Sequence, residues 1–140
     1  MATSVYLSNP VVTINSVALT DQCTSAVVNY VLEQLETTSF GDTARKYGAS
    51  TVTSLQNNSI EVELYQSYAA AETEATIFGL VGITTNVVVA PASGTATATN
   101  PIYTLTGCYL ESHTPINASL GELSTITLTF AGGVLTKAVA

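Results

Sequence analysis

Residues 59–68 read SIEVELYQSY, and this alternating stretch decides the fold class. Ile60, Val62 and Leu64 fall on one face of an extended chain, and the glutamates between them fall on the other. Residues 124–130, STITLTF, repeat the pattern with apolar side chains on one face and threonines on the other. Strands with one apolar and one polar face predict an antiparallel sheet that covers a core on one side only.

Other segments add strands around this pair. β-branched and aromatic residues predict strands over residues 11–16, 83–90 and 102–111. Residues 24–35 fit a helical stripe as well as a strand, and their valines and tyrosine favour one long strand. Residues 134–140, which follow a glycine pair, are expected to form a short tail.

One helix is predicted, over residues 69–81. This segment is rich in alanine, and Glu72 and Glu74 near its start suit the positive end of a helix dipole. Gly82 follows as a residue that ends helices. The side chains expected to face the core are Ile77, Phe78 and Val81. The order of elements predicts a mainly β fold, a β-sandwich or rolled barrel with one flanking α-helix and a long inter-strand loop.

That loop has no periodicity. Residues 37–58 read TTSFGDTARKYGASTVTSLQNN, and a compact domain rarely keeps so long a loop without using it. Arg45 and Lys46 within it are two of the three cations of the chain. A Gly-Asp step signals a turn in which Asp42 is expected to pair with Arg45. We expect residues 1–140 to form a single domain that carries this loop.

The charge composition of the chain excludes a nucleic-acid-binding function. Only 9% of residues are charged, where about 25% is typical of a soluble domain, and ten acids against three bases give a net charge of −7. So few cations cannot make a surface that grips phosphates. The mean hydropathy is +0.37, yet no apolar run approaches the roughly 18 residues of a membrane span, and the start lacks a basic signal-peptide region. An apolar, weakly charged surface of this kind predicts obligate assembly.

No catalytic, cofactor-binding or metal motif stands out in the sequence. His113 is the only histidine, and without a nucleophile elbow it is predicted to lie exposed in a turn. Glu61 and Glu63 share a strand face but lack the asymmetric pocket that a catalytic acid pair needs. Cys23 and Cys108 are predicted to stay reduced and buried. The sequence therefore predicts a protein that is not an enzyme.

Four segments, taken in order, resemble the major tail proteins, or tail tube proteins, of long-tailed (siphovirus-type) bacteriophages. They are VYLSNPVVTINSVALTDQCTSAVVNY (5–30), ETTSFGDTARKYGAS (36–50), NNSIEVELYQSYAAAETEATIFGLVG (57–82) and ATNPIYTLTGCYLESHTPINASLGELSTITLTF (98–130). Each motif alone is weak, and their order and spacing carry the resemblance over most of the chain.

The resemblance implies a structural virion protein without a cofactor. Such proteins form hexameric rings that stack into a tube, and each subunit donates strands to a continuous inner barrel. DNA passes through the lumen without specific binding. The implied partners are other copies of the chain, a tail terminator, a tape measure protein and a distal tail protein, with no membrane partner. The implied location is the virion tail, assembled in the host bacterial cytoplasm.

Two sets of residues acquire expected roles from this resemblance and from charge. An acidic lumen repels DNA phosphates, so Glu61 and Glu63, with Glu33 as a lesser candidate, are expected to line the channel. The long loop is expected to bridge one ring to the next, because its cations would find carboxylates there. Its expected contact residues are Phe40, Asp42, Arg45 and Lys46.

Other functions fit the same sequence. A capsid decoration protein would also be small, rich in β-structure and threonine, and non-catalytic. Inner-tube proteins of contractile tails and secretion systems would share the architecture. A carbohydrate-binding or adhesin β-sandwich would need exposed aromatic residues, which this chain could supply from Tyr65, Tyr68, Tyr103 and Tyr109.

Overall fold

The computed structural model describes residues 10–32, 34–47 and 56–139. In these residues eight strands form one antiparallel sheet, accompanied by one short helical segment. The strands are β1 (Val11–Ile14), β2 (Val17–Ala18), β3 (Cys23–Asn29), β4 (Ser59–Tyr65), β5 (Thr84–Ala90), β6 (Ile102–Leu110), β7 (Thr125–Ala131) and β8 (Val134–Ala138). The helical segment consists of α1 (Thr73–Ile77) and a 3₁₀ turn, η1 (Phe78–Leu80). The predicted mainly β fold is confirmed.

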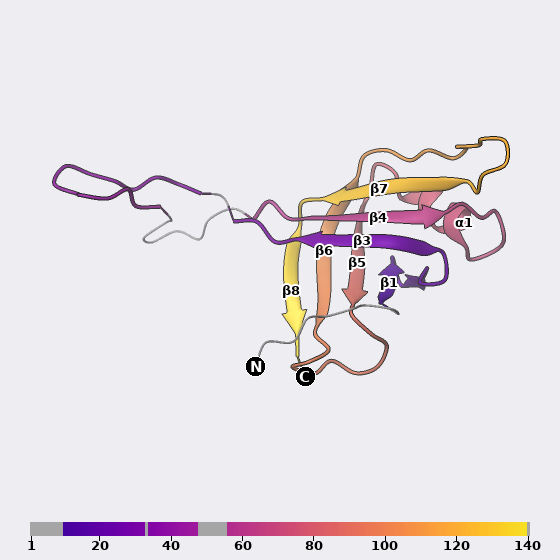
Figure 1. Ribbon diagram of the computed structural model, residues 1–140, viewed down its shortest axis with the longest axis horizontal. Coiled ribbons are helices and arrows are strands. Elements are labelled where there is room, and N and C mark those ends of the chain that lie inside the picture. Colours follow the sequence, from indigo (N-terminus) through magenta and orange to yellow (C-terminus); the bar gives the residue numbers. More distant parts are fainter. Residues whose placement is uncertain (1–9, 33, 48–55, 140) are drawn as a thin grey trace.

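Strand β6 joins two layers of the sheet. β5 pairs along one side of β6, whereas β8 and β7 share the other side. β8 pairs with residues 102–106, and β7 pairs only with Tyr109 and Leu110. The sheet therefore bends near the end of β6, and Figure 1 shows β3, β4 and β7 running across β1, β5, β6 and β8. This crossed arrangement of two layers encloses the core.

The core lies between these layers. The buried side chains of the first layer are those that alternation predicted, namely Ile60, Val62, Leu64, Ile126, Leu128 and Phe130. The opposite layer contributes Val12, Ile14, Val87, Leu105 and Leu110. Fully burying a side chain of this size contributes about 1.5–3 kcal/mol, so these facing rows hold the layers together.

Two glycines turn the corner from β7 to β8. Gly132 and Gly133 have φ values of 80° and 86°, a region that residues with a Cβ rarely adopt. The N–H of Gly132 donates to the carbonyl of Asn58 at 2.9 Å. A Cβ on Gly133 would lie 2.4 Å from the backbone oxygen of Thr106. Position 133 therefore needs glycine for space as well as for conformation.

The residues that were expected to form a short tail contain strand β8. It pairs with β6 from Thr106↔Val134 to Ile102↔Ala138. Of its side chains, Leu135 is the one that packs against the core. A short edge strand with one inward side chain leaves too little alternation to be recognised in the sequence.

The helical segment is shorter than predicted. α1 starts later than residue 69, because the chain turns at Ala71, whose φ is 62°. After Ile77 the chain continues as the 3₁₀ turn, in which side chains three residues apart lie above one another. Ile77 and Leu80 therefore face the core, whereas Phe78 and Val81, which were expected there, are exposed. No helix in the described ranges is long and apolar enough to cross a membrane.

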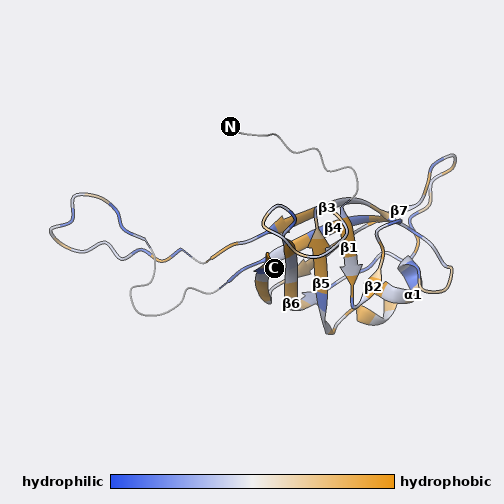
Figure 2. Ribbon diagram, turned by 90° about the horizontal axis from the view of Figure 1, so that it is seen from below, coloured by the Kyte–Doolittle hydropathy of each residue, from blue (hydrophilic) through white to orange (hydrophobic). Residues whose placement is uncertain are grey.

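Strand β3 ends at Asn29, and the chain then leaves the sheet. The strand favoured for residues 24–35 is thus confirmed in its first half. Residues 34–47 form a projection that we call the arm. Figures 1 and 2 both show the arm extending from the end of β3 and β4 away from the two layers. A pairing between Leu32 and Gln56 marks its base.

Candidate functional site

The outer face of the β3–β4–β7 layer carries two of the acidic residues expected to line a channel, and we call it the polar face. Glu61 and Glu63 are exposed on β4, the central strand of this layer. Their neighbours across the strands are Val27, Ser25, Thr129 and Thr127. Within the described residues neither glutamate takes part in an ion pair. Glu33, the third candidate, lies outside the described residues.

Hydrogen bonds across the arm give it the shape of a hairpin. Glu36 and Tyr47 form a bridge between its two sides. The N–H of Thr37 donates to the carbonyl of Lys46 at 2.8 Å. The N–H of Lys46 donates in turn to Oγ1 of Thr38, also at 2.8 Å. The arm therefore holds its own shape beyond the sheet.

Both cations of the arm are paired within it. Arg45 pairs with Glu36, and Lys46 Nζ lies 2.8 Å from Asp42 Oδ1. The prediction that Asp42 pairs with Arg45 is wrong, because the hairpin places Arg45 against Glu36 and leaves Lys46 for Asp42. Hydrogen bonds from Lys46 and from the N–H of Ser39 hold the pKa of Asp42 below its usual value. Arg45, Glu36 and Lys46 are largely exposed, so each pair adds little stability.

The tip of the arm presents an aromatic ring. Phe40 is fully exposed, in a turn where Asp42 Oδ2 accepts a hydrogen bond from the N–H of Ser39 at 2.7 Å. A large apolar side chain held out on an ordered turn is typical of an interaction anchor. The four residues that were expected to contact a neighbouring ring all lie on this hairpin: Phe40, Asp42, Arg45 and Lys46.

Strands at the margins of the sheet lack a partner on one side. In the described part of the chain, β3 pairs only with β4, β8 only with β6, and β2 only with β1. An unpaired edge exposes backbone N–H and carbonyl groups and is a template for pairing with another chain. The edge of β3 is seven residues long. The sheet is therefore open and offers edges for assembly.

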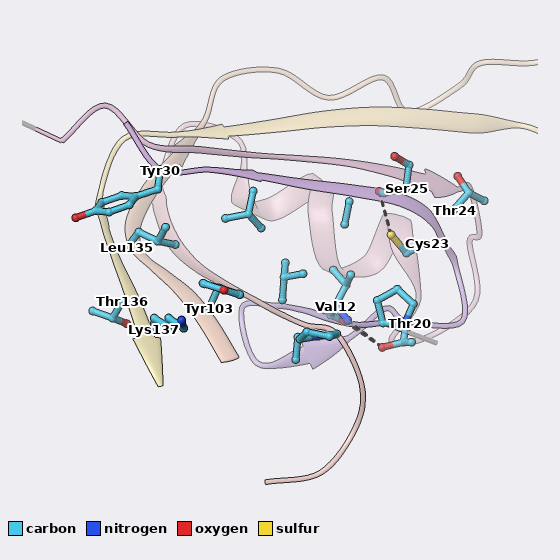
Figure 3. A pocket seen from close by; sticks show the side chains of 16 residues that line it. Val12, Thr20, Cys23, Thr24, Ser25, Tyr30, Tyr103, Leu135, Thr136 and Lys137 are labelled. Carbon is cyan, nitrogen blue, oxygen red and sulfur yellow. Dashed lines mark hydrogen bonds between the residues drawn. The ribbon is translucent and has the colours of Figure 1, made fainter. Parts of the chain in front are cut away.

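A cleft of about 950 Å³ opens between the two layers, and we call it the interlayer groove. One wall comes from β3 and the other from strands of the opposite layer (Figure 3). Its apolar lining includes Val12, Ala26, Val28, Val89, Tyr103 and Leu135. Lys137 is the one charged residue among the described residues that line it. Sequence reasoning missed the groove, because the inward residues of β3 resemble ordinary core positions.

His113 is buried, so its predicted position in an exposed turn is wrong. Its side chain is 1% exposed, and Nε2 lies 2.8 Å from Glu74 Oε2. The ring of Phe78 meets it edge-on, with the ring centroids 6.4 Å apart. The segment after β6 packs back towards α1, where Gln66 Nε2 donates to the carbonyl of Pro115 at 2.7 Å. His113 fastens this segment to the helix.

Both cysteines are free thiols, and the prediction that both are buried is confirmed for Cys108 only. Cys108 is fully buried, whereas Cys23 is partly exposed and lines the interlayer groove. Burial raises the pKa of both thiols, and the charge of Glu63 raises that of Cys23 further. In the residues that the structure describes, no three His, Cys, Asp or Glu side chains gather where they could hold a metal ion.

No family model and no curated protein matches the chain. Solved structures share its fold. A chain from the virion of a native gene transfer agent particle is similar with a TM-score of 0.72 at 14% identity, over 97% of this chain and 100% of that chain. A chain from the anti-feeding prophage tube-terminating cap is similar with a TM-score of 0.68 at 11% identity, over 100% and 94% of the two chains. A chain from the sheath/tube terminator of the extracellular contractile injection system PVC is similar with a TM-score of 0.68 at 10% identity, over 99% of each chain.

Proposed function

We propose that this chain is a structural, non-enzymatic subunit of a siphovirus-type phage tail, and that it polymerises with itself into the tail tube. The observation that carries the proposal is the open sheet, with an unpaired edge along β3 in the described residues. Copies that pair edge to edge remove such edges. The fold shared with chains of a virion and of tube terminators supports the same assignment. The whole chain, residues 1–140, then acts as one tail-tube-like domain.

The proposed ring contains six copies, the number that the family resemblance implies. The path of paired strands ends at β2 on one side and at β3 on the other, so a copy can offer one margin to each neighbour. Repeating one contact around a ring closes the sheet into a barrel without leaving an edge. Stacked rings would then form the tube.

The polar face of β4 is proposed to face the lumen. Its other side is the core, so the outward glutamates and threonines are free to line a channel. Each copy has a net charge of −7, and negative charge on the wall repels DNA phosphates. DNA would therefore slide past Glu61 and Glu63, with Glu33 as a further lumen candidate, without sticking to the wall.

The arm is proposed to bridge one ring to the next through Phe40, Asp42, Arg45 and Lys46. Because both cations already have partners within the arm, their inter-ring role can be separated from their internal one. Arg45→Glu with Lys46→Glu should block tube formation and leave the subunit folded. The control adds Glu36→Arg and Asp42→Lys, which restores attraction within the arm while keeping the reversed positions. Normal tubes from this control would show that the cations act only inside the arm.

The proposed partners follow from the same resemblance. They are other copies of the chain, together with a tail terminator, a tape measure protein and a distal tail protein. DNA would pass without specific binding, and neither a cofactor nor a membrane is needed. The proposed location is the virion tail, after assembly in the host bacterial cytoplasm.

A second candidate is a subunit that terminates a tube. Two of the chains that share the fold come from tube-terminating assemblies. A terminator would form single rings that bind the end of a tube formed by another protein. A tube subunit would form long polymers by itself.

Electron microscopy of the purified protein at rising concentration tests the proposal. We expect tubes with a central channel that lengthen as the concentration rises. Single rings at every concentration would favour the terminator. Monomers or trimers at millimolar concentration would contradict both assignments and would favour a decoration protein or a binding domain.

A further inference from the structure

We propose that the interlayer groove receives the arm tip of a second copy of this chain, with Phe40 as the anchoring side chain. This inference rests on the proposed self-assembly and identifies the surface that the arm occupies. It joins two features of the structure that otherwise have no explanation, a fully exposed aromatic ring and an apolar groove.

The groove has the shape and lining of a binding site. Its volume of about 950 Å³ falls within the range of roughly 300–1,000 Å³ typical of pockets that enclose a ligand. Figure 3 shows side chains from the two layers facing one another across it, with Tyr30 and Leu135 near one end and Cys23 near the other. Ala26 and Val28 on β3 are only partly buried, although they pack against the core. Among the described residues, nothing therefore covers the apolar interior along this side.

The arm tip is organised before binding. The turn around Phe40 is held by the hydrogen bond from Ser39 to Asp42 and by the pair between Asp42 and Lys46. A side chain on such a turn loses little conformational freedom on docking, which favours affinity. Aromatic side chains that fill well-packed, desolvated pockets are typical of interaction hot spots. Phe40 thus has the chemistry that the groove requires.

In this conformation the arm tip cannot reach the interlayer groove of its own copy, since the arm extends away from both layers in two perpendicular views (Figures 1 and 2). The donor and acceptor surfaces therefore belong to different copies. When a contact between two different surfaces of the same protein repeats head to tail, it gives a ring if the rotation closes and an open polymer if it does not. Stacking of successive rings needs the open, head-to-tail form.

Charge favours the groove over the rest of the body. The arm contains Glu36, Asp42, Arg45 and Lys46 and is neutral, so the remainder of the chain carries the whole net charge of −7. No carboxylate is found among the described residues that line the groove, and Lys137, which makes no ion pair with any of the described residues, lies in its wall. The described lining of the groove therefore presents no negative charge to the acidic residues of the arm.

The other exposed apolar loop is a poorer acceptor for the arm tip. Leu120 and Leu123 are both highly exposed in it. Glu122 lies between these leucines and would repel Asp42 at the arm tip.

Cross-linking to the native thiol of Cys23 tests the proposal, because Cys23 lines the groove and Cys108 is fully buried. Thr43→Cys, with Ala44→Cys as a second position, places a thiol beside Phe40 on the arm. In assembled tubes a short bismaleimide should join these positions to Cys23 of another copy and give a ladder of covalent oligomers. The ladder should be lost when Cys23→Ser is added. Phe40→Ala should raise the concentration needed for tubes by about tenfold or more.

Each of the other outcomes would contradict the groove proposal, and one of them would contradict the tube proposal as well. Tubes in which neither arm position reaches Cys23 would overturn the groove as acceptor and leave the tube proposal intact. Cross-linking to Leu120→Cys in place of Cys23 would move the arm to that loop and would likewise overturn the proposal. A Cys23 thiol already protected in the dilute monomer would show that the groove is filled by its own chain. No assembly by the unmodified protein would remove both proposals.

Discussion

Gly133→Ala should destabilise the subunit strongly, because position 133 forms the corner where the chain passes from one layer to the other. The φ of Gly133 is 86°, and adopting this region costs a residue with a Cβ about 1–2 kcal/mol. The new Cβ would also lie 2.4 Å from the oxygen of Thr106 and 3.0 Å from the nitrogen of Cys108. Both are backbone atoms of β6, so the strand itself would have to shift.

The neighbouring glycine provides a matched control. Gly132 has a φ of 80°, but a Cβ there would meet nothing within 4 Å. Gly132→Ala should therefore cost only the conformational term of about 1–2 kcal/mol. Gly133→Ala should add the cost of overpacking, about 1–3 kcal/mol, for a total of about 2–5 kcal/mol. That total is a large fraction of the 5–15 kcal/mol typical of a folded domain.

Urea unfolding of the two variants measures this difference, at a concentration below that of assembly. The free energy of unfolding should fall more for Gly133→Ala than for Gly132→Ala, with similar slopes against urea. Equal losses would show that β6 does not press against this corner, and the bent-sheet reasoning would be refuted.

Three further predictions concern the charged and thiol groups. Because the pKa of Asp42 is lowered in the folded protein, the contribution of Asp42 to the stability of the arm should be fully present above the ordinary value of 3.8. It should be lost as the pH falls through the lower folded value. A carboxyl NMR titration with a midpoint at or above 3.8 would contradict this. Maleimide should modify Cys23 in the folded monomer but Cys108 only on unfolding, and equal rates would contradict the burial of the core thiol. Glu61→Lys combined with Glu63→Lys should slow DNA ejection from assembled particles while the subunit stays folded, whereas unchanged ejection kinetics would remove these glutamates from the channel wall.

Alternation made much of the sheet predictable. Ile60, Val62 and Leu64 each bury against the opposite layer, so the period of two in the sequence is the period of the packing. β8 was not predicted, because Leu135 is the one side chain of this strand that packs against the core. The inward face of the helical segment was misplaced because its second half is a 3₁₀ turn, and that geometry depends on tertiary packing.

The site residues were predictable only in part. Composition singled out the loop that became the arm, because Arg45 and Lys46 stand out in an acidic chain. The ion-pair partners depend on the hairpin register, which single-residue turn signals do not encode. The burial of His113 depends on Glu74, 39 residues away in the sequence. Contacts of that separation leave no local pattern.

Amide hydrogen exchange of β3, followed before and after assembly, tests most directly whether other copies complete the open sheet. In the dilute monomer we expect the amides at the free edge of β3 to exchange rapidly, while the central amides of β4 are protected. Assembly should protect the β3 edge and leave β4 unchanged. Full protection of that edge in the monomer, or continued rapid exchange in the polymer, would contradict the account.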